Sequence, residues 1–355
     1  MLRSFKKRIL IFFITTFLSA SLSAETAVEN ASKEGEYRGA KTATHPTWFK
    51  QSFLDLDDDV SDATDAGKRL VLYFWQPGCP YCSQLWEENF ADDKTVDFFR
   101  KHFEIIAINM WGDRDVISVA GTDYTEKSFA AALNIKYTPT LLFFDENKKV
   151  VHRLNGYIPP TDFKLALSFV AEKQEKKQSF GKYVSSQVTT SNETKELHAE
   201  PFFMKKGFNL NRTKQKSEKY LAVFFEQGNC KNCDLLHDKT LKDKTTRALV
   251  KQFDAIQLAR NANTPVTTPE GIKTTAKEWA DSLNIAYLPA IIFFDGNGGK
   301  EVMRIDAQMR SFHIQSVFDY VLTGTYKTEA NFQRYISARA DKIRATGVDV
   351  DIWAY

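Results

Sequence analysis

Cysteine is scarce in this chain of 355 residues, and its placement argues against structural disulfides. The four copies form two Cys-x-x-Cys pairs, Cys79/Cys82 and Cys230/Cys233, and no other cysteine is present. A chain this long needs no covalent staple, and a two-residue loop restricts the unfolded chain little. The pairs therefore favour thiol–disulfide exchange over bracing.

Patterns for metal and dinucleotide binding are also lacking. The cysteine pairs are 151 residues apart (230 − 79), too far for one zinc site, although Cu(I) binding by either pair stays open. No glycine-rich dinucleotide motif is visible, so we expect no cofactor and no resident metal. The histidines lack metal-ligand spacing, and we expect five of them to be surface or packing residues: His102, His152, His198, His237 and His313.

Residues 1–24 have the pattern of a cleavable signal peptide. Basic residues come first, an apolar run covers residues 9–18, and small residues lead to Ala24. An uncleaved anchor is the rival interpretation, and no later segment is apolar for long enough to span a membrane. Cleavage would remove four basic residues and change the net charge from +3 to about −1, so nucleic acid is not an expected partner.

Cys79 stands where a short apolar run meets a helix. Residues 70–75 are typical of a buried strand, and a helical pattern follows to about residue 90. The free N–H groups and the dipole at a helix N-terminus favour a thiolate there. We therefore expect Cys79 to be the attacking sulfur and Cys82, one turn further, to be the resolving thiol.

Residues 45–170 predict one α/β domain in which short strands form a mixed sheet between helices. The acidic run Asp57–Asp59 reads as a solvated helix face, and residues 111–125 read as a loop. We expect helices at 48–66, 79–90, 94–102, 126–133 and 161–173, and strands at 70–75, 105–110, 141–145 and 150–154.

The second half of the chain repeats this plan. Residues 134–145 match 284–295 at an offset of 150, and residues 72–79 match 223–230 at an offset of 151. Two motifs held in register indicate a tandem duplication, with a second α/β domain at 201–325.

The remaining stretches lie between and after the two domains. Residues 171–200 read as a polar linker, and the apolar pieces 201–204 and 208–210 as segments that dock on the second domain or between domains. Residues 326–355 predict a C-terminal helix at 329–345, followed by a tail that forms an edge strand or packs across a domain seam.

A strand, a Cys-x-x-Cys at a helix start and a Thr-Pro before a later strand together resemble the thioredoxin superfamily, over residues 45–170 and more weakly over 200–325. With the terminal stretch 332–353, the whole chain is similar to periplasmic thioredoxins associated with bacterial sulfur oxidation. The resemblance implies two tandem thioredoxin-like domains in the periplasm.

The resemblance also implies roles for residues around the first pair. Pro139 would be a cis-proline facing the disulfide, and Thr138 would offer its backbone to an extended substrate segment. Trp75 falls where many members carry an active-site tryptophan. The other implied substrate-binding residues are Pro80, Tyr81, Leu288 and Pro289.

The chain departs from the family pattern at two places. Tyr73 and Phe224 occupy the position of a buried aspartate, so the motif identifies no proton acceptor for Cys82. In the second domain Glu226 replaces Trp75, although Lys231 beside Cys230 favours a thiolate. The second pair is therefore either a redox relay or part of a substrate-docking domain with a slow disulfide.

These observations predict a monomeric thiol–disulfide oxidoreductase that acts on protein thiols and disulfides. Cys79 and Cys82 carry the exchange, and Cys230 and Cys233 are a second redox-active pair. A membrane protein would supply electrons, because no dinucleotide site is visible. The alternatives are a non-catalytic client-binding or copper-handling protein and a disulfide isomerase.

Overall fold

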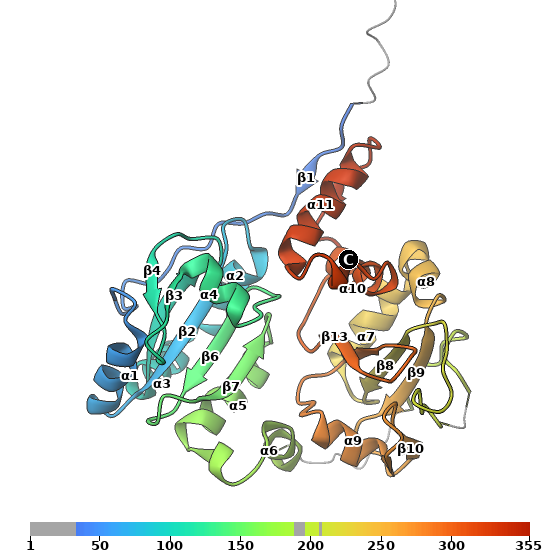
Figure 1. Ribbon diagram of the computed structural model, residues 1–355, viewed down its shortest axis with the longest axis horizontal. Helices are drawn as coiled ribbons and strands as arrows, with labels where there is room; N and C mark the ends of the chain where they lie inside the picture. The colour runs from blue at the N-terminus through green and yellow to red at the C-terminus, as the bar shows by residue number, and fades with distance from the viewer. Residues whose placement is uncertain (1–32, 188–195, 206–207) are drawn as a thin grey trace, which may run out of the picture. The chain divides into compact units, whose positions relative to one another are not determined.

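The computed structural model describes residues 33–187, 196–205 and 208–355 (Figure 1). The expected signal peptide, 1–24, lies outside the described residues. Within the described ranges, no helix has the length and apolar character needed to cross a bilayer.

Domain 1 contains a four-stranded mixed sheet in the order β3-β2-β6-β7. β2 is parallel to β3 and antiparallel to β6, and β7 is antiparallel to β6. The strands are β2 (Arg69–Trp75), β3 (Phe103–Asn109), β6 (Thr140–Phe144) and β7 (Val150–Asn155). The helices are α1 (Leu56–Asp65), α2 (Pro80–Gln84) with its π-helical continuation Leu85–Asn89, α3 (Asp93–His102), α4 (Glu126–Ala132) and α5 (Pro160–Ala171).

Domain 2 repeats this topology with the sheet order β13-β12-β8-β9. The equivalent strands pair in the same directions, which confirms two α/β domains of one plan. The strands are β8 (Leu221–Glu226), β9 (Asp254–Ala259), β12 (Ala290–Phe294) and β13 (Glu301–Ile305). The helices are α7 (Lys231–Asp238), α8 (Lys244–Val250), α9 (Ala276–Ser282) and α10 (Ser311–Leu322), with a short 3₁₀ turn at Thr240–Lys242.

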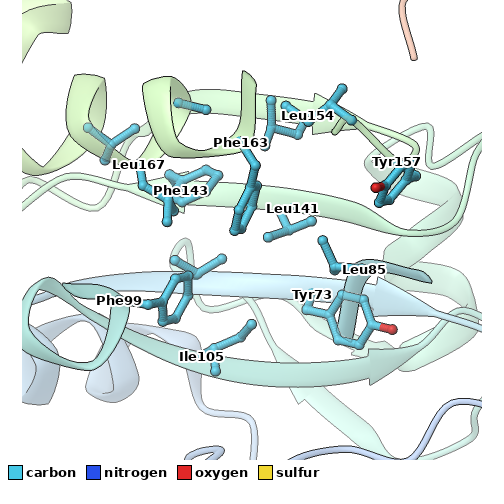
Figure 2. Packing of buried hydrophobic residues seen from close by; sticks show 14 of the residues in the cluster. Tyr73, Leu85, Phe99, Ile105, Leu141, Phe143, Leu154, Tyr157, Phe163 and Leu167 are labelled. Atoms are coloured by element: carbon cyan, nitrogen blue, oxygen red, sulfur yellow. The ribbon is translucent and has the colours of Figure 1, made fainter. Parts of the chain in front are cut away.

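β2 is buried on both faces, so its whole run is apolar rather than alternating. Val71 and Tyr73 belong to the core on one face. Figure 2 shows Tyr73 there, with Phe143 and Phe163 packed between the sheet and the helices. Leu70, Leu72 and Phe74 enter the core on the other face. Because side chains alternate along a strand, one short segment serves two cores and fixes the register of the sheet.

The first predicted helix is shorter than expected. Leu54 has a positive φ of 66°, which a helix does not allow, and Asp55 caps α1 by accepting from the N–H groups of the first turn. The expectation of a solvated acidic face is wrong for Asp59, which is buried, accepts from Ser52 and lies 3.3 Å from Lys50.

The predicted loop at 111–125 contains a small hairpin, β4 (Asp115–Ile117) with β5 (Asp123–Thr125). Domain 2 has the same hairpin, β10 (Pro265–Thr267) with β11 (Lys273–Thr275). Strands of three residues are too short to show a period of two in the sequence, so the pattern missed them.

The described residues outside the two sheets form further helices and a short strand. The polar stretch expected to be a linker contains α6 (Phe180–Gln187), while Phe203 and Leu210 join the cores of domain 2 as expected. After the 3₁₀ turn Thr325–Lys327, α11 (Phe332–Arg344) leads to β14 (Val350–Asp351). β14 pairs in parallel with β1 (Tyr37–Arg38) in a separate two-stranded sheet, so the tail does not add an edge strand to either four-stranded sheet.

Candidate redox sites

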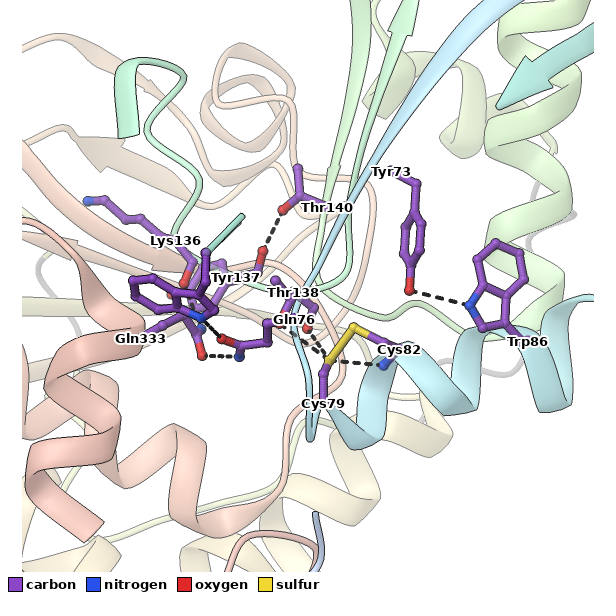
Figure 3. Close-up of a disulfide and its surroundings, with 11 residues drawn as sticks. Tyr73, Gln76, Cys79, Cys82, Trp86, Lys136, Tyr137, Thr138, Thr140 and Gln333 are labelled. Carbon is purple, nitrogen blue, oxygen red and sulfur yellow. Dashed lines mark hydrogen bonds between the residues drawn. A yellow bond between two sulfur atoms is a disulfide. The ribbon is translucent and has the colours of Figure 1, made fainter. Parts of the chain in front are cut away.

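Cys79 lies at the start of α2, immediately after the turn that ends β2. Its backbone is extended, its sulfur accepts the N–H of Cys82 at 3.1 Å, and Pro80 occupies the first helical position. The two cysteines form a disulfide (Figure 3). The geometry therefore gives a sulfur anion at Cys79 a backbone donor at a helix N-terminus, as the sequence predicted.

Thr138 faces this disulfide from the segment just before β6. The Thr138–Pro139 peptide bond is cis, and the Thr138 hydroxyl donates to Cys79 Sγ at 3.3 Å. The carbonyl oxygen of Thr138 lies 3.5 Å from the same sulfur (Figure 3). The hydroxyl adds a second donor to Cys79, one that the sequence did not indicate.

Replacing Thr138 by valine is expected to raise the pKa of the reduced Cys79 thiol by about one unit. A hydrogen bond to a charged group contributes about 1.5–3 kcal/mol, and one pKa unit corresponds to about 1.4 kcal/mol. A raised pKa lowers the thiolate fraction at pH 7, so alkylation by iodoacetamide should slow correspondingly. Thr138→Ser keeps the hydroxyl and should retain the pH profile of the wild-type chain. If Thr138→Val and Thr138→Ser had the same pH profile, the Thr138 hydroxyl would not stabilise the Cys79 thiolate.

The first disulfide opens into a cavity of about 320 Å³. Four predicted site residues line this cavity: Cys79, Pro80, Tyr81 and Thr138. Cys82 does not line it. Residues of domain 2 and the tail also line it, including Met309, His313 and Ile352. The cavity thus reaches the predicted attacking sulfur, which is only 3% exposed.

Tyr81 ties the first site to domain 2. Its hydroxyl accepts the backbone N–H of Arg310 at 2.8 Å and lies 3.3 Å from Nδ1 of His313. Its ring packs edge-on against His313 and Trp353. Burial raises the pKa of Tyr81 and lowers that of His313 to about 4, so both groups are neutral near pH 7. Tyr81, one of the two residues between the cysteines, is therefore held in a contact with domain 2 and the tail.

A chain of amide hydrogen bonds joins the loop before Cys79 to α11. Trp111 Nε1 donates to Gln76 at 2.7 Å. Gln76 Nε2 donates to Gln333 Oε1 at 2.7 Å (Figure 3). Gln333 in turn donates to the carbonyl of Lys136 at 2.8 Å. These residues are far apart in the sequence, and no motif indicated them.

Two tyrosines at equivalent positions of the two repeats each pack into the core of the other domain. Tyr137, next to the first cis-proline loop, donates to the carbonyl of Arg304 at 2.7 Å and belongs to the core cluster of domain 2. Its repeat counterpart Tyr287 belongs to a core cluster of domain 1. In the same contact, the N–H of Gln308 donates to the carbonyl of Tyr157 at 2.9 Å. We call these contacts the domain seam.

The surroundings behind the first disulfide are aromatic. Tyr73, in the position of the family's buried aspartate, accepts from Trp86 Nε1 at 3.3 Å (Figure 3). Trp75 is partly buried, packs edge-on against His45 at 4.5 Å, and does not line the cavity beside Cys79. Its predicted substrate contact stays a prediction.

The second pair has the same local geometry but different exposure. Cys230 caps α7, its sulfur accepts the N–H of Cys233 at 3.0 Å, and the two form a disulfide. Cys230 is partly exposed, whereas Cys233 is fully buried. The Leu288–Pro289 bond is cis, and Pro289 lines a cavity of only about 30 Å³. The second attacking sulfur is thus more accessible than the first.

A buried polar cluster lies beside the second pair. Glu226 is fully buried at the end of β8 and lies 2.9 Å from Nε2 of His237, which is 2% exposed. Sequence analysis identified Glu226 only as the replacement for Trp75 and did not predict its contact with His237. His237 is buried, but it is not simply a packing residue, because both ring nitrogens face carboxylates. The available signal was the spacing in the sequence, because His237 follows Cys233 by four residues.

The other histidines show no metal centre. Within the described residues, no group of three or more His, Cys, Asp or Glu side chains could hold a metal ion. His152 is buried against Phe143 and Phe169, as expected for a packing residue, and burial lowers its pKa to about 3.

Comparison with known proteins identifies the family of the chain. The family model described as a thioredoxin-like domain matches the chain twice, over residues 56–171 and 209–322. Similar solved structures include a thioredoxin-fold protein from Helicobacter pylori (18% identity, 39% of this chain and 91% of that chain covered, TM-score 0.32) and a thioredoxin from Thermus thermophilus (20%, 34%, 86% and 0.28, respectively). The first two thioredoxin domains of Saccharomyces cerevisiae Eps1p cover 71% of this chain and 89% of their own, at 13% identity and a TM-score of 0.22. No curated protein matches the sequence.

Proposed function

The chain belongs to the thioredoxin-like domain family, and we propose that it is a periplasmic thiol–disulfide oxidoreductase acting on protein substrates. Two thioredoxin-like domains that each carry a Cys-x-x-Cys pair support disulfide exchange in general. The observation that carries the proposal is the repeated site: a disulfide whose first sulfur caps a helix, in a domain with a cis-proline before the third sheet strand.

Reduction of a substrate would proceed in two displacements. The Cys79 thiolate attacks one substrate sulfur, and the other substrate sulfur leaves as a thiolate. Cys82 then attacks the Cys79 sulfur, so the Cys79–Cys82 disulfide forms and the second substrate thiolate leaves. Two electrons pass to the substrate, and a partner dithiol must return them; we propose a membrane protein for this task.

Location and subfamily belong to the same proposal. Export rests on the signal pattern at 1–24, and a role in a sulfur-oxidation system rests on the resemblance of residues 332–353. Monomeric action is consistent with two active-site domains in one chain.

Reduction of insulin disulfides by dithiothreitol tests the activity. The wild-type chain is expected to shorten the delay before insulin precipitates, and a variant with serine at all four cysteines is expected to behave as buffer. A wild-type chain no faster than the four-serine variant would overturn the proposal. Copper retained on purification in that case would favour the metal-handling alternative.

A further inference from the structure

We propose that the first pair reduces small organic disulfides that carry a carboxylate, and that Arg334 binds this carboxylate in the cavity beside Cys79. The inference rests on the proposed disulfide exchange and names the substrate class of domain 1. Exchange with protein disulfides then belongs to the second pair.

The cavity at the first pair has the size and walls of a small-molecule site. Its volume is about 320 Å³, and Cys79 and Thr138 line it. Small-molecule sites have volumes of about 300–1,000 Å³ and combine mostly apolar and aromatic walls with a few polar groups. Tyr37, Trp111 and Tyr157 supply aromatic walls here. A small dialkyl disulfide therefore finds both room and apolar contact next to the predicted attacking sulfur.

The walls of this cavity come from distant parts of the chain, which restricts the approach of a folded protein. Besides the loops of domain 1, residues of β1, α10 and α11 line it. The hydroxyl of Tyr81 accepts the N–H of Arg310 at 2.8 Å, and Gln76 donates to Gln333 at 2.7 Å (Figure 3). Cys79 is only 3% exposed. A protein disulfide reaches this sulfur only after such contacts break, whereas a small disulfide enters the cavity as it stands.

The charges that line the cavity favour an anionic ligand. Among the described residues, no aspartate or glutamate lines it, and Arg334 does. Burial lowers the pKa of His313 to about 4, so this lining histidine is neutral at pH 7. A guanidinium group binds a carboxylate through two parallel hydrogen bonds. A carboxylate is therefore the end group that this lining recognises, and an ammonium group would be repelled.

Arg334 is placed to meet a ligand in this cavity. Its guanidinium carbon lies 6.0 Å from the ring centroid of Trp111, which donates to Gln76 three residues before Cys79. Its ion-pair partner is Glu329 at 3.4 Å, and 55% of the arginine side chain is exposed. A surface pair of this kind contributes little free energy. The guanidinium can therefore exchange Glu329 for the carboxylate of a ligand.

The second pair presents its sulfur differently. The cavity that Pro289 lines has a volume of only about 30 Å³, which is room for a water molecule or two. Cys230 is partly exposed, so a partner can reach it at the surface. Two copies of one fold thus place one attacking sulfur in a cavity of ligand size and the other in contact with solvent. A division between small and protein substrates accounts for this difference.

The reaction balances with the reduced pair as the reductant. The Cys79 thiolate attacks one sulfur of the small disulfide, and the other sulfur leaves as a thiolate with the bonding pair. Cys82 gives its proton to that leaving thiolate and attacks Cys79 Sγ, and the second small thiolate leaves. The Cys79–Cys82 disulfide forms, and two electrons have reduced one small disulfide to two thiols.

The test uses the full chain with Cys230 and Cys233 replaced by serine, so that only the first pair reacts. The reduced protein is mixed with dithiodipropionate, hydroxyethyl disulfide or cystamine, which are dialkyl disulfides with anionic, neutral and cationic end groups. Alkylation at successive times gives the rate at which Cys79–Cys82 forms. Each rate is divided by the rate of the same compound with free dithiothreitol. The corrected rate of dithiodipropionate is expected to exceed that of cystamine about tenfold, and a ratio of one or less would overturn the proposal.

A substitution of Arg334 tests its part in this preference. Arg334→Gln is expected to lower the ratio of the dithiodipropionate rate to the hydroxyethyl disulfide rate about fivefold. A loss of folded protein would lower both rates alike and leave their ratio unchanged. Lys342→Gln removes a positive charge from an exposed position of the same helix and should keep the wild-type ratio. An unchanged ratio in Arg334→Gln, or an equal fall in Lys342→Gln, would overturn the proposal.

Insulin as the disulfide distinguishes this inference from the proposed exchange. After the same correction, insulin is expected to oxidise the first pair about tenfold or more slowly than hydroxyethyl disulfide, because access to the sulfur limits exchange. An equal or faster reaction with insulin would overturn the small-substrate inference and leave the proposed exchange with proteins standing. If none of the four disulfides oxidised the first pair, both the inference and the proposed exchange at domain 1 would be wrong.

Discussion

Replacing Cys230 by serine is expected to remove the fast phase in which the oxidised chain reacts with a reduced protein, and replacing Cys79 is expected to remove a slower phase. Disulfide exchange requires a thiolate to reach the sulfur that it attacks. Cys230 is partly exposed beside the exposed Lys231. Cys79 is 3% exposed and lines a cavity that Tyr137 and Gln308 of the domain seam also line. We expect the two phases to differ in rate by about tenfold or more, because restricted access slows exchange.

The measurement is alkylation and mass spectrometry of samples quenched at successive times after mixing with a reduced protein dithiol. Cys233 and Cys82 report which pair has opened. A small reductant such as dithiothreitol serves as the comparison, and the difference between phases should shrink with it. If Cys79–Cys82 opened first with the protein dithiol, the exposure argument would be wrong.

The repeated fold and both cysteine pairs could be predicted because their signals are local. The apolar run of β2 and its copy in β8 identify central strands, and each Cys-x-x-Cys follows at a helix start. The matching offsets of the two motifs then require two copies of one topology. Local pattern therefore located the sulfurs, and the family resemblance supplied the cis-proline at Pro139.

The contacts around those sulfurs could not be predicted, because they join residues distant in the chain. Tyr81 meets Arg310 across 229 residues, and Gln76 meets Gln333 across 257. No periodicity encodes such pairs. The hydrogen bond between His237 and Glu226 was missed for a related reason. The spacing of the histidines excluded a metal site, and the contact with Glu226 could be recognised only after β8 and α7 were packed together.

Replacing Tyr137 and Tyr287 together by alanine is expected to speed the reaction of Cys79–Cys82 with protein thiols about a hundredfold. Each side chain is buried in a core cluster of the other domain. Loss of a large buried aromatic side chain costs about 3–5 kcal/mol, and a factor of a hundred needs only about 2.8 kcal/mol. The seam would therefore open often enough for a protein thiol to reach Cys79, even if part of the loss were offset by repacking.

The same quenched-flow alkylation measures this effect, with Tyr124→Ala as the matched control. Tyr124 is a partly buried tyrosine of domain 1 that packs on Phe129 within that domain. The control should lower stability without changing the access of protein thiols to Cys79. Reduction by dithiothreitol should change less than reduction by a protein, because a small thiol depends less on seam opening. Equal acceleration by both reductants would instead indicate that the substitutions alter the disulfide itself, and the seam would then not control access to the first site.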